Sequence, residues 1–497
     1  MKKTILLSVG LFYLLSGSSQ QRTFPTDTVV STNHTVTIRG QKINYVAHAG
    51  MQSVYSDKGD SAIASLNFTY YKRTGVSDVS KRPLLISFNG GPGSASVWMH
   101  LAYTGPSVLK LSDEGDPVQP YGYKNNPHSV LDAADILYVN PVNTGYSRIL
   151  QKGGKGADRK NFFGINADIK YLAAWLTDFM NQHNRWLSPK FLIGESYGGT
   201  RVSGLAHELQ QKQWMYLNGV ILVSPADYKT FESDRPLKMA LFFPYYVATA
   251  WYHQLLPVSL QQKSLDVLLP EAEQFTLNNL LPALSKGSSL PNSERKKLAE
   301  QMADYTSLPA SFFIDHQLAV PPKFYWKNLL QEHPYLTVGR LDSRYKGLDR
   351  IPLGNEPDYN AELTAWLHAF TPAINHYQKN VLNFNLATPY QVFGDVHPWD
   401  RTKNDTREQL RKAMAINPQL NVMFQCGLYD GATTYFHAKY TMWQLDPSGN
   451  LNNRMSFKTY PSGHMMYLRK PDLKQANEDL RAFILSSINF NKAIKYE

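Results

Sequence analysis

The chain has 497 residues, of which 43% are hydrophobic. This composition allows a large buried core and therefore excludes an intrinsically disordered protein. The chain is also longer than one ordinary domain. The formal charge is +11, but the basic residues are scattered singly, so we expect a solvated surface and no nucleic-acid partner. Cys426 is the single cysteine, which excludes an intramolecular disulfide.

The N-terminus has the pattern of an export signal. Lys2 and Lys3 form a basic region, residues 5–15 are mostly apolar, and small residues follow at 16–19. The apolar run is too short to span a bilayer comfortably, so a membrane anchor is the less favoured alternative and we expect no stable membrane insertion. We predict a signal peptide over residues 1–20 and a periplasmic or extracellular protein. An exported chain without disulfides favours a bacterial source.

The region after the signal is rich in predicted strands. Residues 35–38 and 43–46 predict a hairpin, and residues 65–71 continue the pattern. Short apolar runs then end at turn residues, which is typical of strands in a parallel sheet that is buried on both faces. These runs cover residues 84–88, 136–139, 191–193 and 220–223.

Helical patterns lie between these runs. Apolar residues recur at offsets of three and four over residues 166–183, and residues 200–211 predict a second helix. The alternation of strands and helices predicts an α/β fold with a mostly parallel central sheet flanked by helices.

The middle of the chain changes character. Residues 227–395 have little strand signal, and we expect helices at 255–281, 293–305 and 360–382. We interpret this block as a mostly helical cap insertion over the functional site. It divides the core into residues 21–226 and residues 396–497, where strands at 421–426 and 456–460 precede a final helix at 471–485.

One segment, Gly194-Glu195-Ser196-Tyr197-Gly198, lies between a predicted strand and a predicted helix. The pattern Gly-x-Ser-x-Gly places a serine on a strained strand-to-helix turn, where glycines allow the chain to fold back. The five residues alone recur by chance in unrelated chains. Their context favours a nucleophilic Ser196 over a small-residue turn in the core, and the fold is then an α/β-hydrolase.

A nucleophilic serine needs a base and a group that orients the base, in the chain order serine, acid, histidine. His464 follows the predicted strand 456–460, and Asp430 follows the strand 421–426. Both lie where loops leave strand ends, which is where α/β folds assemble their sites. We predict His464 as general base and Asp430 as its partner, with Asp446 and Asp395 as alternatives for the acid.

A glycine-rich loop follows the strand 84–88 and has the sequence Asn89-Gly90-Gly91-Pro92-Gly93. The loop lacks the lysine of a phosphate-binding P-loop, which argues against that alternative. Backbone N–H groups of Gly90 or Gly91 could instead form an oxyanion hole with the N–H of Tyr197.

Five segments together resemble the serine carboxypeptidase family, the relatives of yeast carboxypeptidase and cathepsin A. The resemblance implies removal of a C-terminal amino acid from a peptide with a free C-terminus. It also implies that Asn89 and Glu195 bind the terminal carboxylate of that peptide. The segments are Asn89-Gly90-Gly91-Pro92-Gly93-Ser94, Asn140-Pro141-Val142-Asn143-Thr144-Gly145-Tyr146-Ser147, Gly194-Glu195-Ser196-Tyr197-Gly198-Gly199, Gly427-Leu428-Tyr429-Asp430 and Gly463-His464-Met465.

The chain also departs from the family pattern. Ser87 stands where the family usually has a tryptophan, and Tyr103 stands where a second glutamate of the carboxylate clamp usually lies. Asn143 replaces a usual glycine, and Ser94 replaces a cysteine. Tyr103 could donate its hydroxyl to a carboxylate instead. With one glutamate in the clamp, we expect weaker acid dependence than two paired carboxylates would give.

The altered clamp leaves other functions open. An esterase or acyltransferase of the same fold, acting on non-peptide acyl compounds, is the main alternative, and a binding protein with an inactive site is the least favoured. The histidines lack metal-ligand spacing and the chain lacks a cofactor fingerprint, so we expect neither a metal nor a cofactor. The sequence does not indicate the oligomeric state.

Overall fold

The computed structural model describes residues 25–152, 155–402, 404–490 and 493–496. The predicted signal over residues 1–20 lies outside the described residues and stays a prediction. Within the described ranges, no helix combines the length and apolar character that crossing a bilayer requires.

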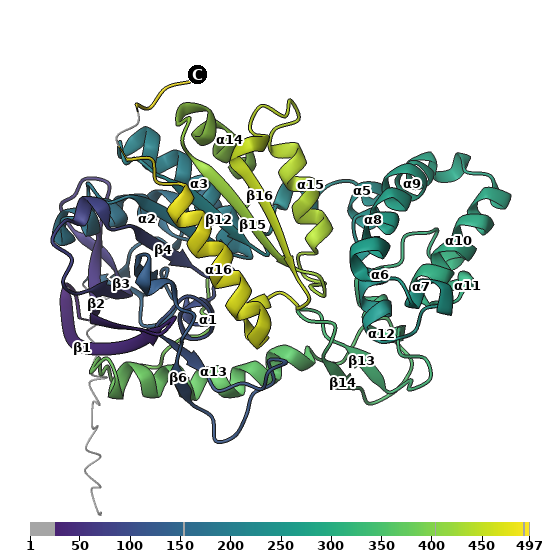
Figure 1. The fold of residues 1–497 in the computed structure, drawn as a ribbon, viewed down its shortest axis with the longest axis horizontal. Coiled ribbons are helices and arrows are strands. Elements are labelled where there is room, and N and C mark those ends of the chain that lie inside the picture. The colour runs from purple at the N-terminus through teal and green to yellow at the C-terminus, as the bar shows by residue number, and fades with distance from the viewer. Residues whose placement is uncertain (1–24, 153–154, 403, 491–492, 497) are drawn as a thin grey trace, which may run out of the picture.

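The core of the described chain is a ten-stranded mixed sheet, in the order β1-β2-β3-β7-β4-β11-β12-β15-β16 with β8 beside β3 (Figure 1). The strands from β7 to β16 are mutually parallel, whereas β1, β2 and β3 form an antiparallel extension. The strand bounds are β1 Thr28–Ile38, β2 Gln41–Tyr55, β3 Ala62–Arg73, β4 Leu84–Phe88, β7 Asp135–Val139, β8 Arg148–Ile149, β11 Lys190–Glu195, β12 Gly219–Val223, β15 Asn421–Gly427 and β16 Met455–Tyr460.

Helices cover both faces of this sheet, as predicted for an α/β fold. The helix bounds in the core are α1 Val97–Ala102, α2 Ile165–His183, α3 Tyr197–Lys212, α14 Thr406–Ile416, α15 Tyr435–Leu445 and α16 Lys470–Ser486. Single 3₁₀ turns lie at Val79–Lys81, Val130–Asp132, Arg159–Asn161, Asn452–Arg454 and Met466–Leu468. Two small strand pairs complete the core region, β5 Ser107–Leu109 with β6 Tyr123–Asn125, and β9 Gln151–Lys152 with β10 Lys155–Gly156.

Successive side chains of the central strands point to opposite faces of the sheet and pack into two separate apolar cores. In β11, Leu192 packs with the helices α2, α3 and α14, whereas Phe191 and Ile193 pack on the opposite face with α16. The strand β12 divides in the same way, with Leu222 on one face and Ile221 on the other. The near-continuous apolar runs in the sequence therefore reflect strands that are buried on both faces.

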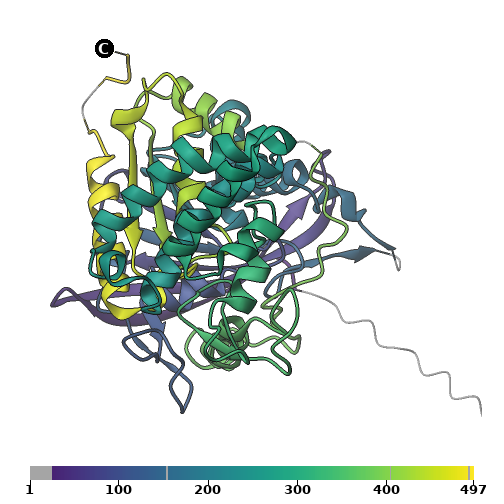
Figure 2. The ribbon, with the colours of Figure 1, turned by 90° about the vertical axis from the view of Figure 1, so that its right-hand side faces the viewer.

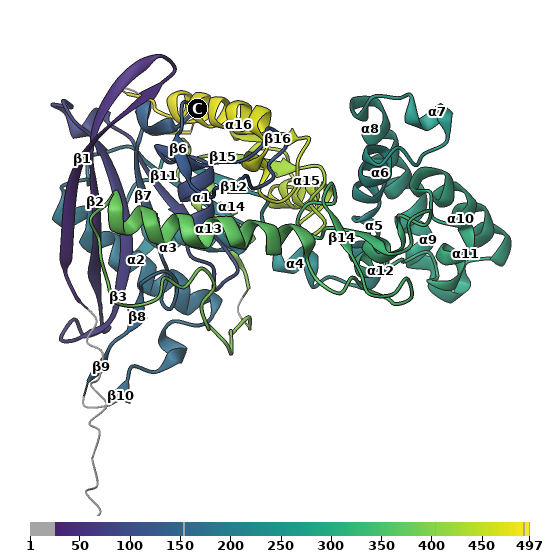
Figure 3. The ribbon, with the colours of Figure 1, turned by 90° about the horizontal axis from the view of Figure 1, so that it is seen from below.

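Part of the chain between β12 and β15, residues 240–338, forms a group of helices with an apolar core of its own. Figures 1 and 3 show α5 to α12 standing beside the sheet, and Figure 2 shows these teal helices in front of it. Figure 3 shows α13 running back along the core. The bounds are α4 Tyr228–Phe231, α5 Arg235–Ala240, α6 Phe243–Tyr252, α7 Val258–Gln261, α8 Leu265–Phe275, α9 Leu281–Lys286, α10 Asn292–Thr306, α11 Ala310–Asp315, α12 Pro322–Asn328 and α13 Ala361–Asn380, with a π-helical turn at Thr276–Leu280 and a 3₁₀ turn at Gly287–Ser289.

Two predictions for this block are wrong in detail. The single helix predicted over residues 255–281 is divided, because Pro257 disfavours a helical residue before it and the backbone is extended again at Ser264. The block also contains a short hairpin of β13 Leu336–Val338 and β14 Lys346–Leu348, which the sequence pattern did not indicate. The predicted helices at 293–305 and 360–382 are confirmed as α10 and α13.

The parallel strands bring four loops to one edge of the sheet. Neighbouring parallel strands end at the same edge, so the residues that follow β4, β11, β15 and β16 converge there. These loops carry the predicted site residues.

Candidate active site

Ser196 lies at a sharp turn between β11 and α3. Its backbone angles are φ 58° and ψ −124°, a region that residues other than glycine rarely adopt. The Ser196 N–H donates to the carbonyl of Val223 at 3.0 Å, which fastens the turn to the neighbouring strand β12. Gly194 is required because a Cβ there would lie 2.1 Å from the carbonyl oxygen of Gly198. The pentapeptide thus forms the strained elbow that the sequence predicts.

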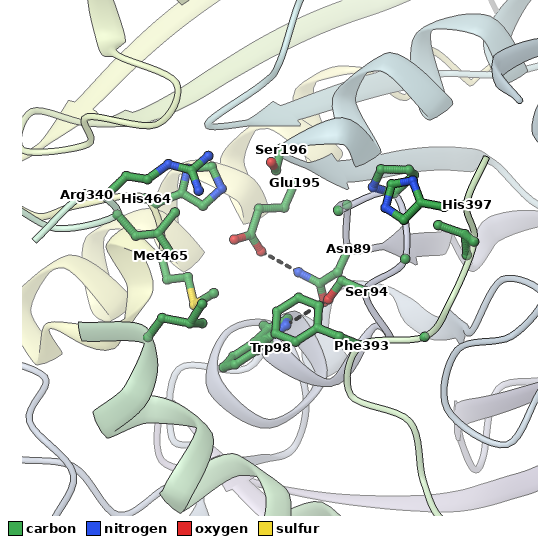
Figure 4. A pocket seen from close by; sticks show the side chains of 18 of the residues that line it. Asn89, Ser94, Trp98, Glu195, Ser196, Arg340, Phe393, His397, His464 and Met465 are labelled. Atoms are coloured by element: carbon green, nitrogen blue, oxygen red, sulfur yellow. Dashed lines mark hydrogen bonds between the residues drawn. The ribbon is translucent and has the colours of Figure 1, made fainter. Parts of the chain in front are cut away.

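The elbow opens into a cavity of about 390 Å³. Ser196 and His464 both line it, and Figure 4 shows their side chains on the same side of the pocket. The glycine-rich loop forms one wall, whereas Arg340, Leu341 and Leu363 come from the block between β12 and β15. Other lining residues are Ser94, Trp98, Glu195, Phe393, Gly394, Val396, His397, Arg401 and Met465.

His464 and Asp430 form a buried pair. Asp430 Oδ2 lies 2.7 Å from His464 Nδ1, while Asp430 Oδ1 accepts from the backbone N–H groups of Ala432 and Thr433. The hydroxyl of Thr433 lies 2.7 Å from Asp430 Oδ2 and 3.0 Å from His464 Nδ1, so it belongs to the same network. This arrangement fixes the imidazole ring and directs its second nitrogen away from Asp430.

Burial and charge act in opposite directions on the pKa of His464. Burial alone would lower it, because an apolar environment disfavours the imidazolium ion. The charge and hydrogen bond of Asp430, together with the charge of Glu195, outweigh burial and raise the pKa above its ordinary value. The pair therefore favours the protonated histidine that forms when it accepts a proton from a serine.

The alternative acids lie elsewhere. Asp446 accepts from the backbone N–H of Leu451 and caps a turn, and Asp395 pairs with the exposed Arg159. Asp430 is the acid that the fold brings to His464.

The glycine-rich loop lies directly against the elbow. A Cβ at Gly90 would lie 2.6 Å from the backbone nitrogen of Tyr197, so only glycine allows this approach. Gly90 and Gly91 line the pocket beside Ser196. The backbone of the loop and the first turn of α3 thus meet at Ser196, where backbone N–H groups can stabilise a developing oxyanion.

Glu195 and Asn89 form a buried pair beside the nucleophile. Asn89 Nδ2 donates to Glu195 Oε2 at 2.5 Å (Figure 4). The hydroxyl of Tyr467 donates to the same oxygen at 2.6 Å. Burial raises the pKa of Glu195 to about 7, although the charge of His464 and the two hydrogen bonds act to lower it. Near neutral pH, Glu195 is therefore divided between a carboxylate and a neutral acid that can donate a hydrogen bond.

Tyr103 does not point its hydroxyl into the pocket, so it cannot bind a substrate carboxylate there. Its hydroxyl donates to Gln425 Oε1 at 2.6 Å, and its ring stacks on Tyr467 at 4.8 Å, away from the pocket lining. The reason is the position of Tyr103 after α1, where it is fully buried between the sheet and α16. Tyr467, which the sequence analysis did not single out, contacts Glu195 instead. Ser87 is buried and contacts Met99.

Asn143 and Ser94 have local explanations. Asn143 adopts φ 67°, a conformation that asparagine tolerates better than most residues, which accounts for a position that is usually glycine. The hydroxyl of Ser94 accepts from the indole N–H of Trp98 at 2.9 Å and holds that ring in the pocket wall.

A segment over residues 340–344 connects the two loops that carry Asp430 and His464. The N–H of His464 donates to the Leu341 carbonyl at 2.6 Å, and the N–H of Gly431 donates to the Arg340 carbonyl at 3.0 Å. The Asp342 carboxylate accepts from the N–H of Gly463. This connection could not be predicted from the sequence, because the segment lies far from both loops along the chain.

No group of three or more His, Cys, Asp and Glu side chains could hold a metal ion in the part of the chain that the structure describes.

The sheet, the elbow at its edge and the Asp430–His464 pair define the class of protein as an α/β-hydrolase. A family model described as serine carboxypeptidase matches residues 43–265. Serine carboxypeptidase-like 10 of Arabidopsis thaliana is 27% identical over 175 residues, or 33% of this chain and 38% of that protein. The human retinoid-inducible serine carboxypeptidase is 30% identical over 143 residues, 28% of each chain. The predicted resemblance to the serine carboxypeptidase family is confirmed.

The comparison with solved structures concerns the fold. A prohormone-processing carboxypeptidase from Saccharomyces cerevisiae superposes with a TM-score of 0.54 at 14% identity, covering 89% of this chain and 92% of that one. At this identity the likeness shows the shared fold. The sequence match to the first curated relative spans about two fifths of its length.

We predict that Gly90→Ala lowers kcat about 10²–10³-fold, the loss typical when one oxyanion-hole donor is displaced. The added methyl group would meet the backbone of Tyr197 and push the loop away from the elbow. Turnover of an aryl ester measures the effect. Gly122→Ala is the matched control, because a Cβ there meets only the end of Lys110 at 3.8 Å. Equal activity of the two variants would contradict the assignment.

We also predict that Glu195→Gln moves the acid limb of the pH profile to lower pH. The base must be neutral to accept a proton, so activity is lost as pH falls through the pKa of His464. The negative charge of Glu195 raises that pKa, and its removal lowers it. The measurement is kcat/KM for an aryl ester against pH, with Glu300→Gln, which replaces an exposed carboxylate of α10, as control. An unchanged acid limb, or one displaced to higher pH, would refute this coupling.

Proposed function

We propose that the protein is a serine-type carboxypeptidase that removes the last residue of a peptide. The observation that carries this proposal is the Asn89–Glu195 pair, which lies beside Ser196 in the same pocket. An amide N–H₂ group and a carboxyl group that is partly protonated near neutral pH are both suited to a substrate carboxylate. A nucleophile next to a carboxylate-binding pair selects the bond nearest the C-terminus.

The reaction begins with attack by the Ser196 hydroxyl on the carbonyl carbon of the last peptide bond. His464 accepts the serine proton, and Asp430 stabilises the resulting imidazolium ion. The N–H groups of Tyr197 and of Gly90 or Gly91 stabilise the oxyanion. His464 then protonates the leaving amine, so the C–N bond breaks and the terminal amino acid departs. Water, activated by His464, hydrolyses the acyl-enzyme and restores Ser196.

The second candidate is an esterase or acyltransferase of the same fold. It is favoured by one observation, namely that Ser87 and Tyr103 are buried away from the pocket and add no polar group to it. The carboxylate clamp is then smaller than the family pattern implies. An acyl acceptor other than water, or an ester leaving group, would use the same triad.

A panel of substrates separates the two functions. We expect cleavage of N-blocked dipeptides with a free C-terminus and little cleavage of the same peptides with an amidated C-terminus. Ser196→Ala should lower kcat about 10⁴–10⁶-fold on every substrate, because the nucleophile is lost. Ser203→Ala is the matched control, since its buried hydroxyl only contacts the Gly199 carbonyl in the same helix.

Two outcomes would contradict the proposal. Turnover of an aryl ester without cleavage of any peptide would favour the esterase. Wild-type activity in Ser196→Ala would refute the assignment of the nucleophile.

A further inference from the structure

Arginine supplies the cationic side chains of the pocket. Arg340 and Arg401 line it, whereas Glu195 is the acidic residue of the lining. Glu195 is committed to Asn89 and Tyr467, and its pKa of about 7 reduces its average charge near neutral pH. The pocket therefore favours an anionic group in its occupant.

Arg340 is held in place by the backbone on both sides of its side chain. Its carbonyl accepts from the N–H of Gly431, and the next residue, Leu341, accepts from the N–H of His464. The N–H of Leu341 in turn donates to the buried carboxylate of Glu362 at 2.7 Å. The two loops that carry Asp430 and His464 thus fix the position from which the Arg340 side chain enters the pocket (Figure 4).

The Arg340 guanidinium differs from those of Arg401 and Arg344 because it lacks an acidic partner within the described residues. Arg401 pairs with Glu232 and lies over the ring of Tyr228. Arg344 donates to both oxygens of Asp342. Among the described residues, Arg340 has neither an ion-pair partner nor a side-chain hydrogen bond, and its side chain is exposed to the pocket. A guanidinium offers a planar set of N–H donors that matches a carboxylate.

We propose that Arg340 binds a carboxylate group of the substrate next to the scissile bond. This inference rests on the proposed function, because it names the part of a peptide that enters the pocket. The carboxylate has two possible sources, the terminal α-carboxylate or an acidic side chain on the last residue. Both present the same chemistry to the guanidinium.

A bound carboxylate would also assist the base. The positive charge of Arg340 opposes protonation of His464, as the direction of its effect on the His464 pKa shows. A substrate anion beside Arg340 offsets this repulsion when the imidazolium ion forms. Substrates that carry the carboxylate should therefore react faster once bound, in addition to binding more tightly.

The test compares Arg340→Gln with Lys346→Gln, which removes the same charge six residues further along, outside the pocket lining. The substrates are N-blocked dipeptides ending in phenylalanine, glutamate or glutamine with a free C-terminus, and a neutral aryl ester. We expect Arg340→Gln to lower kcat/KM about tenfold or more for carboxylate substrates. On the neutral ester, assayed above the acid limb of each protein, neither variant should show a comparable loss, because the ester carries no carboxylate for Arg340 to bind.

The set of substrates whose kcat/KM falls in Arg340→Gln identifies which carboxylate Arg340 binds. Equal losses for all three free acids support the terminal carboxylate, and a loss confined to the glutamate substrate supports an acidic side chain. Unchanged kcat/KM for every peptide, or an equal loss on the ester, would overturn the inference.

A second measurement separates failure of this inference from failure of the proposed function. If the wild type cleaves no peptide, the carboxypeptidase proposal fails, but inhibition of ester turnover still reports on Arg340. Free glutamate and phenylalanine should then inhibit the wild type at least about tenfold more strongly than Arg340→Gln. Their amides should inhibit the two proteins alike. Equal inhibition by the free acids would overturn the role of Arg340.

Discussion

The site depends on one buried charge pair that ties the glycine-rich loop to the nucleophile helix. Arg201 of α3 is fully buried, and its Nε donates to Asp168 of α2 at 2.7 Å. The same guanidinium donates to the carbonyls of Asn89 and Pro92, and the hydroxyl of Tyr197 donates to Asp168. Breaking such a pair leaves an uncompensated buried charge, which typically costs about 3–5 kcal/mol. The loop therefore stays against the elbow.

This pair explains how loops from distant parts of the chain hold a fixed geometry. The parallel sheet brings the strand ends to one edge, but it does not determine where each loop lies relative to that edge. Arg201 fixes the position of the loop at Asn89. The segment over residues 340–344 fixes the positions of the loops at Asp430 and His464. The block between β12 and β15 thus supplies a wall of the pocket and also positions the Asp430–His464 pair.

The residues that meet at the pocket edge could be located from the sequence because their signals are local. Ser196 lies in a five-residue pattern between a strand and a helix, and Asp430 and His464 follow recognisable strands. The strand pattern also predicted the sheet, since apolar runs reflect burial on both faces.

Contacts between distant segments could not be predicted in this way. Tyr467 meets Glu195, and Thr433 meets His464, only after the sheet has folded. Tyr103 misled the sequence analysis because its position along the chain matched a clamp residue, whereas packing turned its hydroxyl towards Gln425. The helix predicted over 255–281 failed because the pattern of apolar residues continued across Pro257 and the extended backbone at Ser264.

The most direct test of the account is the mass of the covalent intermediate. The protein is mixed with an N-blocked dipeptide that has a free C-terminus, quenched in acid within one turnover, digested and analysed by mass spectrometry. The account predicts one acyl group, made of the blocked first residue, on the peptide that contains Ser196, together with release of the free last residue. Peptide cleavage with no adduct on Ser196, or with the adduct on another residue, would contradict it.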